Sequence, residues 1–243
     1  MSRAWASELE AIVRRLTEDD KVRAILVWAE GRMFTAGIDI KDLDMGNAED
    51  MSAAEKSSTF LKTLRKFQAP LTLINKSKKP VIAAVHGNCI GGGVDLITAC
   101  DIRVCTADAT FSVKETKVAI VADLGTIPRI TRIIGKGIYS EMVYTGEAID
   151  ADRALACGLV NKVYKTKEDL LAGARQLASK IAQNSPLVVQ GAKTVIQFAE
   201  EHSYDDTLDY VALWNAAFLD SQDLKEAMMA FFQKRTPVFK NKL

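Results

Sequence analysis

Apolar positions recur at helical spacing in some segments of the chain and form short unbroken runs in others. The helical spacing predicts helices near residues 3–16 and 57–74. Two apolar runs, AILVW at 24–28 and VIAAV at 81–85, are too short and too apolar for surface helices, so they predict buried strands. Weaker runs predict further strands at about 102–106, 110–113 and 159–163.

The order of these elements predicts the fold class. Further helices are expected at 94–100 and over 126–145, the latter broken at Gly135 and Gly137. Strands that alternate with helices are typical of an α/β protein with largely parallel strands. From Lys167 onward only helical patterns remain, and Ser185 followed by Pro186 is a typical helix start. We therefore expect an α/β core over 1–184 and a C-terminal helical region over 185–243.

Composition and charge narrow the possible functions. The formal net charge of +1 gives no indication of binding to nucleic acid or to anionic membranes. No apolar run approaches the roughly 20 residues of a membrane helix. The cysteines form no CxxC pair, which favours free, buried thiols in a reducing compartment: Cys89, Cys100, Cys105 and Cys157. The two histidines, His86 and His202, are far apart in sequence and do not indicate a histidine-rich metal site.

Two glycine loops carry the main chemical signal. HGNCIGGGVD, residues 86–95, follows a predicted buried strand and precedes a helix, so its glycines leave backbone N–H groups uncovered at a helix N-terminus. Such amides suit an anion or a developing oxyanion. A tight turn that needs glycine is an equal alternative from the glycines alone. The loop MFTAGID, residues 33–39, also follows a buried strand and could supply a second amide to the same oxygen.

Three acids near these loops are candidate proton carriers. Asp95 lies just inside the helix after the glycines, and Glu115 and Asp123 flank the apolar stretch TKVAIVA. Apolar surroundings raise the pKa of a carboxyl and fit it for proton transfer. For each acid taken alone, a helix cap or a surface position is the more common role.

The motifs MFTAGID, PVIAAVHGNCIGGGVDL and CDIRV together resemble the crotonase (enoyl-CoA hydratase/isomerase) superfamily. The resemblance extends through GLVNKV at 158–163 and FFQKRTPVF at 231–239, and VKETKVAIVADLGT is most similar to the Δ3,5-Δ2,4-dienoyl-CoA isomerases. The family fold is a spiral of β-β-α units with a C-terminal helical region that forms trimers or hexamers. Family members have strands before the corresponding first helix, so the resemblance implies that core strands precede Met1.

The resemblance also assigns roles to residues. The oxyanion hole would consist of the backbone amides of Ile38 and Gly92. Glu115, Asp123 and Asp95 would be the catalytic acids, with Asp123 at a position that is usually small in the hydratases. Binding of coenzyme A and substrate is implied for five further residues: Ala36, Gly37, Asp39, Phe231 and Lys234.

The implied activity is conversion of 3,5-dienoyl-CoA to 2,4-dienoyl-CoA in fatty-acid β-oxidation, without metal or redox cofactor. The final residues NKL are similar to the peroxisomal address SKL, so a peroxisomal or mitochondrial protein is expected. Two alternatives are an enoyl-CoA hydratase and a non-catalytic or RNA-binding member of the family. The near-zero charge disfavours RNA binding, and the three acids disfavour a non-catalytic role.

Overall fold

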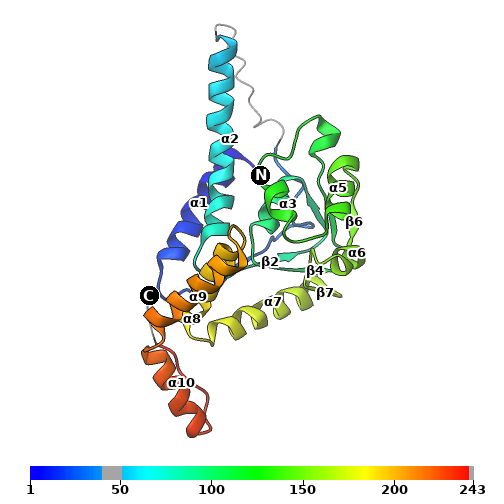
Figure 1. Ribbon diagram of the computed structural model, residues 1–243. Helices are drawn as coiled ribbons and strands as arrows, with labels where there is room; N and C mark the ends of the chain where they lie inside the picture. The colour runs from blue at the N-terminus through cyan, green and yellow to red at the C-terminus, as the bar shows by residue number, and fades with distance from the viewer. Residues whose placement is uncertain (40–50, 241–243) are drawn as a thin grey trace.

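The computed structural model describes residues 1–39 and 51–240, so the NKL sequence at 241–243 lies outside the described residues. Two small sheets form the centre of the molecule (Figure 1). The first has the order β1-β2-β4-β7 and is parallel throughout. Its strands are β1 (Ile25–Val27), β2 (Val81–Val85), β4 (Ile102–Thr106) and β7 (Lys162–Tyr164). The last strand was expected at 159–163 and lies slightly later.

The second sheet has the order β3-β5-β6. Its strands are β3 (Asn88–Ile90), β5 (Thr110–Ser112) and β6 (Ile149–Asp150). β3 pairs with β5 in parallel, and β5 pairs with β6 antiparallel. β3 and β6 were not predicted, because each is only two or three residues long.

Strand β2 is buried on both faces, which explains its unbroken apolar sequence. Ile82 and Ala84 pack with Leu170 and Ala174 of helix α7 (Lys167–Ala182). The alternate residues of the strand, beginning with Val81, face the larger core on the other side. The sheet is thus covered by helix α7 on one face and by the larger core on the other.

Helices α1 (Arg3–Glu18) and α2 (Ala53–Lys76) pack side by side, and the N-terminal half of α2 projects beyond the sheets (Figure 1). The short helix α3 (Gly92–Thr98) is entirely buried. It is followed by the 3-10 helix η2 (Glu115–Val118), α4 (Thr126–Ile130), α5 (Lys136–Thr145) and α6 (Ala151–Ala156).

The prediction of a helix break at Gly137 was wrong. The break lies at Gly135, which is the N-cap of α5, and Gly137 falls within that helix. The first-turn amides of a helix have no intrahelical acceptor, so a glycine there weakens the helix little.

Three helices complete the chain: α8 (Pro186–Ala199), α9 (Tyr204–Phe218) and α10 (Gln222–Phe232). Ser185 caps α8 as expected, by accepting the Val188 amide. In Figure 1, α10 extends away from the sheets at the end of the molecule opposite to the free end of α2. Among the described helices, none is both long and apolar enough to cross a membrane.

Candidate active site

The two glycine loops lie side by side because they follow neighbouring parallel strands, β1 and β2. Backbone hydrogen bonds join them directly. Phe34 N donates to His86 O at 2.8 Å, and Thr35 N donates to Asn88 O at 3.0 Å. Ile90 N in turn donates to Thr35 O at 3.2 Å. The relative position of the loops is therefore fixed by the fold itself.

The expected oxyanion amides, those of Ile38 and Gly92, come together where these loops meet. Gly91 has a φ of 53° and is the N-cap of α3, so Gly92 begins the helix with an uncommitted N–H. Within residues 1–39 and 51–240, neither amide donates to a protein acceptor. A Cβ on Gly92 would lie 3.1 Å from Ile38 Cγ1, and one on Gly37 would lie 3.2 Å from Ile90 O. The approach of the loops thus requires glycine at both positions.

Met1 packs along the first loop. Its amino group donates to Gly37 O at 2.8 Å, and its carbonyl accepts the Asp39 amide at 2.9 Å. Met1 therefore pairs with the residues on both sides of Ile38. Asp39 is exposed and does not line the cavity described next, unlike Ala36 and Gly37.

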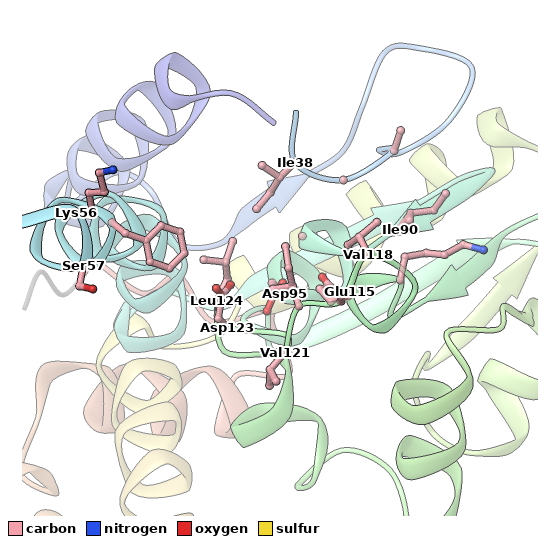
Figure 2. Close-up of a pocket in the computed structure, with 18 residues that line it drawn as sticks. Ile38, Lys56, Ser57, Ile90, Asp95, Glu115, Val118, Val121, Asp123 and Leu124 are labelled. Atoms are coloured by element: carbon pink, nitrogen blue, oxygen red, sulfur yellow. The ribbon is translucent and has the colours of Figure 1, made fainter. Parts of the chain in front are cut away.

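A cavity of about 800 Å³ opens beside the two amides (Figure 2). It lies between the glycine loops, the N-terminal half of α2 and the segment from 114 to 124. All three expected catalytic acids line it, together with Ile38 and Gly92, the two residues of the expected oxyanion hole. The remaining lining residues are mostly apolar, and they include Phe60, Ile90, Val118, Ile120, Val121 and Leu124.

Asp95 is almost completely buried, with 1% of its surface exposed. Its Oδ1 accepts the backbone amide of Thr126 at 2.6 Å, and its own carbonyl accepts from Arg129 Nη2 at 2.9 Å. Burial raises the pKa of the Asp95 carboxyl, while the hydrogen bonds from Thr126 oppose that rise. One carboxylate oxygen is therefore committed to holding the chain.

Glu115 begins the 3-10 helix η2, and its carboxyl lies against the glycine loop. Its Oε1 would be 3.1 Å from a Cβ on Gly91. In the described part of the chain, no group hydrogen-bonds to its buried Oε2. Burial raises the pKa of Glu115 to about 7, helped by the nearby charges of Asp95 and Asp123. A carboxyl with this pKa can both accept and give a proton near neutral pH.

Asp123 reaches the same cavity from the far end of the apolar stretch. Burial also raises the pKa of its carboxyl. Figure 2 shows Asp95, Glu115 and Asp123 close together, with Val118, Val121 and Leu124 nearby. The chain reverses at Ala119, which has a φ of 58° and caps the 3-10 helix. This turn allows two acids that are eight positions apart in the sequence to share one cavity.

The structure does not bring Phe231 and Lys234 to this cavity. Phe231 is 80% exposed on α10, and Lys234 follows that helix with a φ of 52°. Within one copy of the chain, the structure therefore does not bring these two residues to the cavity. The apolar lining of the cavity was not predicted as a binding surface. Part of it, Val118 to Val121, belongs to the apolar stretch between the two acids, whereas Phe60, Ile90 and Leu124 lie outside that stretch.

The chain is similar to known proteins along nearly its whole length. Residues 1–242 match the family model described as enoyl-CoA hydratase/isomerase. A mitochondrial Δ(3,5)-Δ(2,4)-dienoyl-CoA isomerase from Dictyostelium discoideum is 48% identical, over 96% of this chain and 80% of that protein. A peroxisomal Δ(3,5)-Δ(2,4)-dienoyl-CoA isomerase from Arabidopsis thaliana is 42% identical, over 96% of this chain and 84% of that protein.

Among solved structures, an enoyl-CoA hydratase from Bacillus anthracis superposes with a TM-score of 0.90. The superposition covers 99% of this chain and 90% of the hydratase chain, and the two sequences are 30% identical. This similarity confirms the expected fold class.

Proposed function

The chain belongs to the enoyl-CoA hydratase/isomerase family, and from this premise we propose that it isomerises 3,5-dienoyl-CoA to 2,4-dienoyl-CoA in fatty-acid β-oxidation. The observation that carries the proposal is the presence of Asp123 in the same cavity as Glu115 and the two uncommitted amides. Relatives with 42–48% identity bear the name of this isomerase, whereas the hydratase noted above is 30% identical.

The reaction moves two double bonds by moving one proton. The C2–H bond breaks, and its electron pair forms a C1–C2 double bond while the carbonyl π electrons move onto the thioester oxygen. The product is an enolate conjugated with the diene, the dienolate. The amides of Ile38 and Gly92 stabilise the negative oxygen. A proton then adds to C6, which leaves double bonds at C2 and C4. No change in oxidation state occurs, so two carboxyl groups can perform the reaction without a metal or redox cofactor.

The positions of the acids suggest which carbon each serves. Glu115 lies against Gly91, directly before the oxyanion amide of Gly92, and C2 is adjacent to the thioester carbon held there. Glu115 therefore exchanges the proton at C2. Asp123 enters the same cavity from the far end of the apolar stretch, and it is assigned the remaining proton exchange, at C6. Asp95 orients the site, because one of its carboxylate oxygens is held by the Thr126 amide.

The test is the ultraviolet absorbance of the conjugated 2,4 product, measured for the wild type and for Asp123→Asn. The amide cannot exchange a proton, so the variant should lose activity by about 100- to 10,000-fold. Hydration of 2-enoyl-CoA is measured in parallel. If the wild type hydrates 2-enoyl-CoA faster than it isomerises the diene, the protein is a hydratase and the proposal fails. If Asp123→Asn keeps full isomerase activity, the role proposed for Asp123 is refuted.

We further propose that the C-terminal helices assemble the chain into trimers or hexamers. Large apolar side chains are exposed along α9 and α10, and they include Leu208, Leu213, Leu219, Phe231 and Phe232. Exposed apolar surface of this extent usually marks an interface. Such an assembly would also allow Phe231 and Lys234 to reach coenzyme A in a neighbouring copy. Light scattering that shows a monomer at micromolar concentration would contradict this proposal.

The compartment follows from the relatives. The Dictyostelium protein is named mitochondrial and the Arabidopsis protein peroxisomal. We propose one of these two organelles for this chain, and microscopy of the tagged full-length protein would distinguish them.

A further inference from the structure

The backbone on either side of the Asp123 side chain is held by groups that the proposed mechanism does not use. The first is Gln68, on the buried side of α2. Its Nε2 donates to the carbonyl oxygen of Asp123 at 2.6 Å. Its Oε1 accepts from Arg65 Nη1 at 3.2 Å, which is consistent with this orientation of the amide. Helix α2 therefore holds the peptide unit that follows Asp123.

The second group is the guanidinium of Arg129, from α4. Its Nη2 donates to Leu124 O at 3.0 Å and to Asp95 O at 2.9 Å. Its Nε is 3.4 Å from Thr98 Oγ1. Arg129 therefore ties the chain next to Asp123 to helix α3, which begins at the oxyanion amide. A Cβ on Gly125 would overlap this guanidinium, so the arginine fits only because that residue is glycine.

We propose that Gln68 and Arg129 are positioning residues that set the distance from the Asp123 carboxyl to C6 of the substrate. Neither belongs to the described residues that line the cavity, and each donates to a backbone carbonyl rather than to a carboxylate. Gln68 can therefore act on the site through the position of Asp123, and Arg129 acts on it through the position of Asp123 and through its contact with Asp95. The inference rests on the proposed isomerase function.

The two proton carriers give this role a specific signature. Once the dienolate has formed, Asp123 can protonate C6 and complete the reaction, or Glu115 can return a proton to C2 and regenerate the starting diene. In D2O the proton on Glu115 exchanges with solvent, so return places deuterium on C2. When Asp123 is displaced, C6 protonation slows while formation of the dienolate at C2 continues. The ratio of C2 exchange to isomerisation then rises.

The experiment measures both rates in D2O for the wild type, Gln68→Glu and Arg129→Lys. Product is followed by its absorbance, and deuterium in the recovered 3,5-dienoyl-CoA by mass spectrometry. Gln68→Glu preserves shape but sets a carboxylate against the Asp123 carbonyl. Arg129→Lys keeps the charge but loses the planar guanidinium, whose Nη2 donates to two carbonyls while Nε donates to Thr98 Oγ1. Misplacement of a catalytic group by about 1 Å can cost about 100-fold in rate. We expect isomerisation to fall by about 10- to 100-fold and the exchange ratio to rise correspondingly.

Arg132→Gln is the matched control. Arg132 is one helical turn from Arg129, but it faces Glu200 at 3.5 Å on the surface and touches none of the three acids. It should keep the wild-type ratio. Circular dichroism checks that each variant is folded. If Arg129→Lys does not fold, Gln68→Glu alone provides the test.

Three outcomes overturn the inference. Unchanged isomerisation in the folded variants would show that Asp123 needs neither anchor. An equal fall in exchange and isomerisation would indicate a general structural role. A wild type that forms no 2,4 product would refute the proposed function itself, and the inference with it.

Discussion

The carboxylate of Asp95 accepts the backbone amide of Thr126 at 2.6 Å, so a buried acid of the cavity also holds the first residue of α4. This contact connects α3, which begins at the oxyanion amide, to the chain just after Asp123. We therefore expect Asp95 to act in the proposed reaction by positioning the site.

Asp95→Asn and Asp95→Ala separate geometry from proton transfer. The asparagine carbonyl can still accept the Thr126 amide, so this variant should lose no more than about tenfold in turnover, the scale of one hydrogen bond. Alanine leaves the amide unpaired and should be slower and less stable. Turnover and melting temperature are measured for both. Equal, severe losses of turnover in two folded variants would show that Asp95 itself carries a proton.

Gly92 should tolerate no larger side chain. A Cβ there would lie 3.1 Å from the Cγ1 atom of Ile38. The backbone amide of Ile38 is the other proposed oxyanion donor. We expect Gly92→Val to reduce turnover by about 100- to 1000-fold, as the loss of one oxyanion donor does. Circular dichroism checks that the fold survives. Near-normal turnover would refute the assignment of the oxyanion hole.

Glu115 should make the stability of the protein depend on pH. Burial raises the pKa of this carboxyl to about 7 in the folded protein, compared with an ordinary value of 4.5 for glutamate. Between these values the folded protein binds more protons than the unfolded chain, so stability falls as pH rises through this window. Glu115→Gln removes the buried charge and should melt above the wild type at pH 8. The difference should shrink at pH 5, and a constant difference would contradict the raised pKa.

Arg103 should be essential for stability although it lies outside the cavity. It is buried, with Nε donating to Leu159 O at 2.7 Å and Nη1 to Cys100 O at 2.6 Å. Arg103→Met leaves buried carbonyls unpaired and should cost about 3 kcal/mol in the free energy of unfolding. The control Arg14→Gln removes an exposed ion pair with Glu10 and should cost about 0.5 kcal/mol or less. Urea unfolding measures both, and equal costs would contradict the prediction.

The sequence was sufficient for elements whose residues interact with their neighbours along the chain. The apolar run of β2 and the Ser185–Pro186 start of α8 are local patterns, and both elements were predicted correctly. Strand β3 was missed because its three residues lie between glycines, and their pairing partner is β5, more than twenty positions away.

In the candidate site, too, local patterns were predicted from the sequence and long-range contacts were not. The glycine loop at 86–95 was suggested by glycine chemistry, Gly92 within it by the family resemblance, and Glu115 and Asp123 by their apolar surroundings. By contrast, Gln68 is a polar residue on a helix like many others until α2 is placed against Asp123, fifty-five positions away. Its contact depends on the packing of α2, which no pattern along the chain describes.

The hydrogen bonds between the two glycine loops have a consequence for inactivation by heat. Thr35 is bonded to Asn88 and to Ile90, and the same ladder holds the oxyanion amides in place before any substrate arrives. The solvent reorganisation that an oxyanion would need in water is thus replaced by a geometry established during folding. Amide exchange at Thr35 and Ile90 should therefore report on the opening that destroys activity, and catalysis should disappear on heating together with the protection of these two amides.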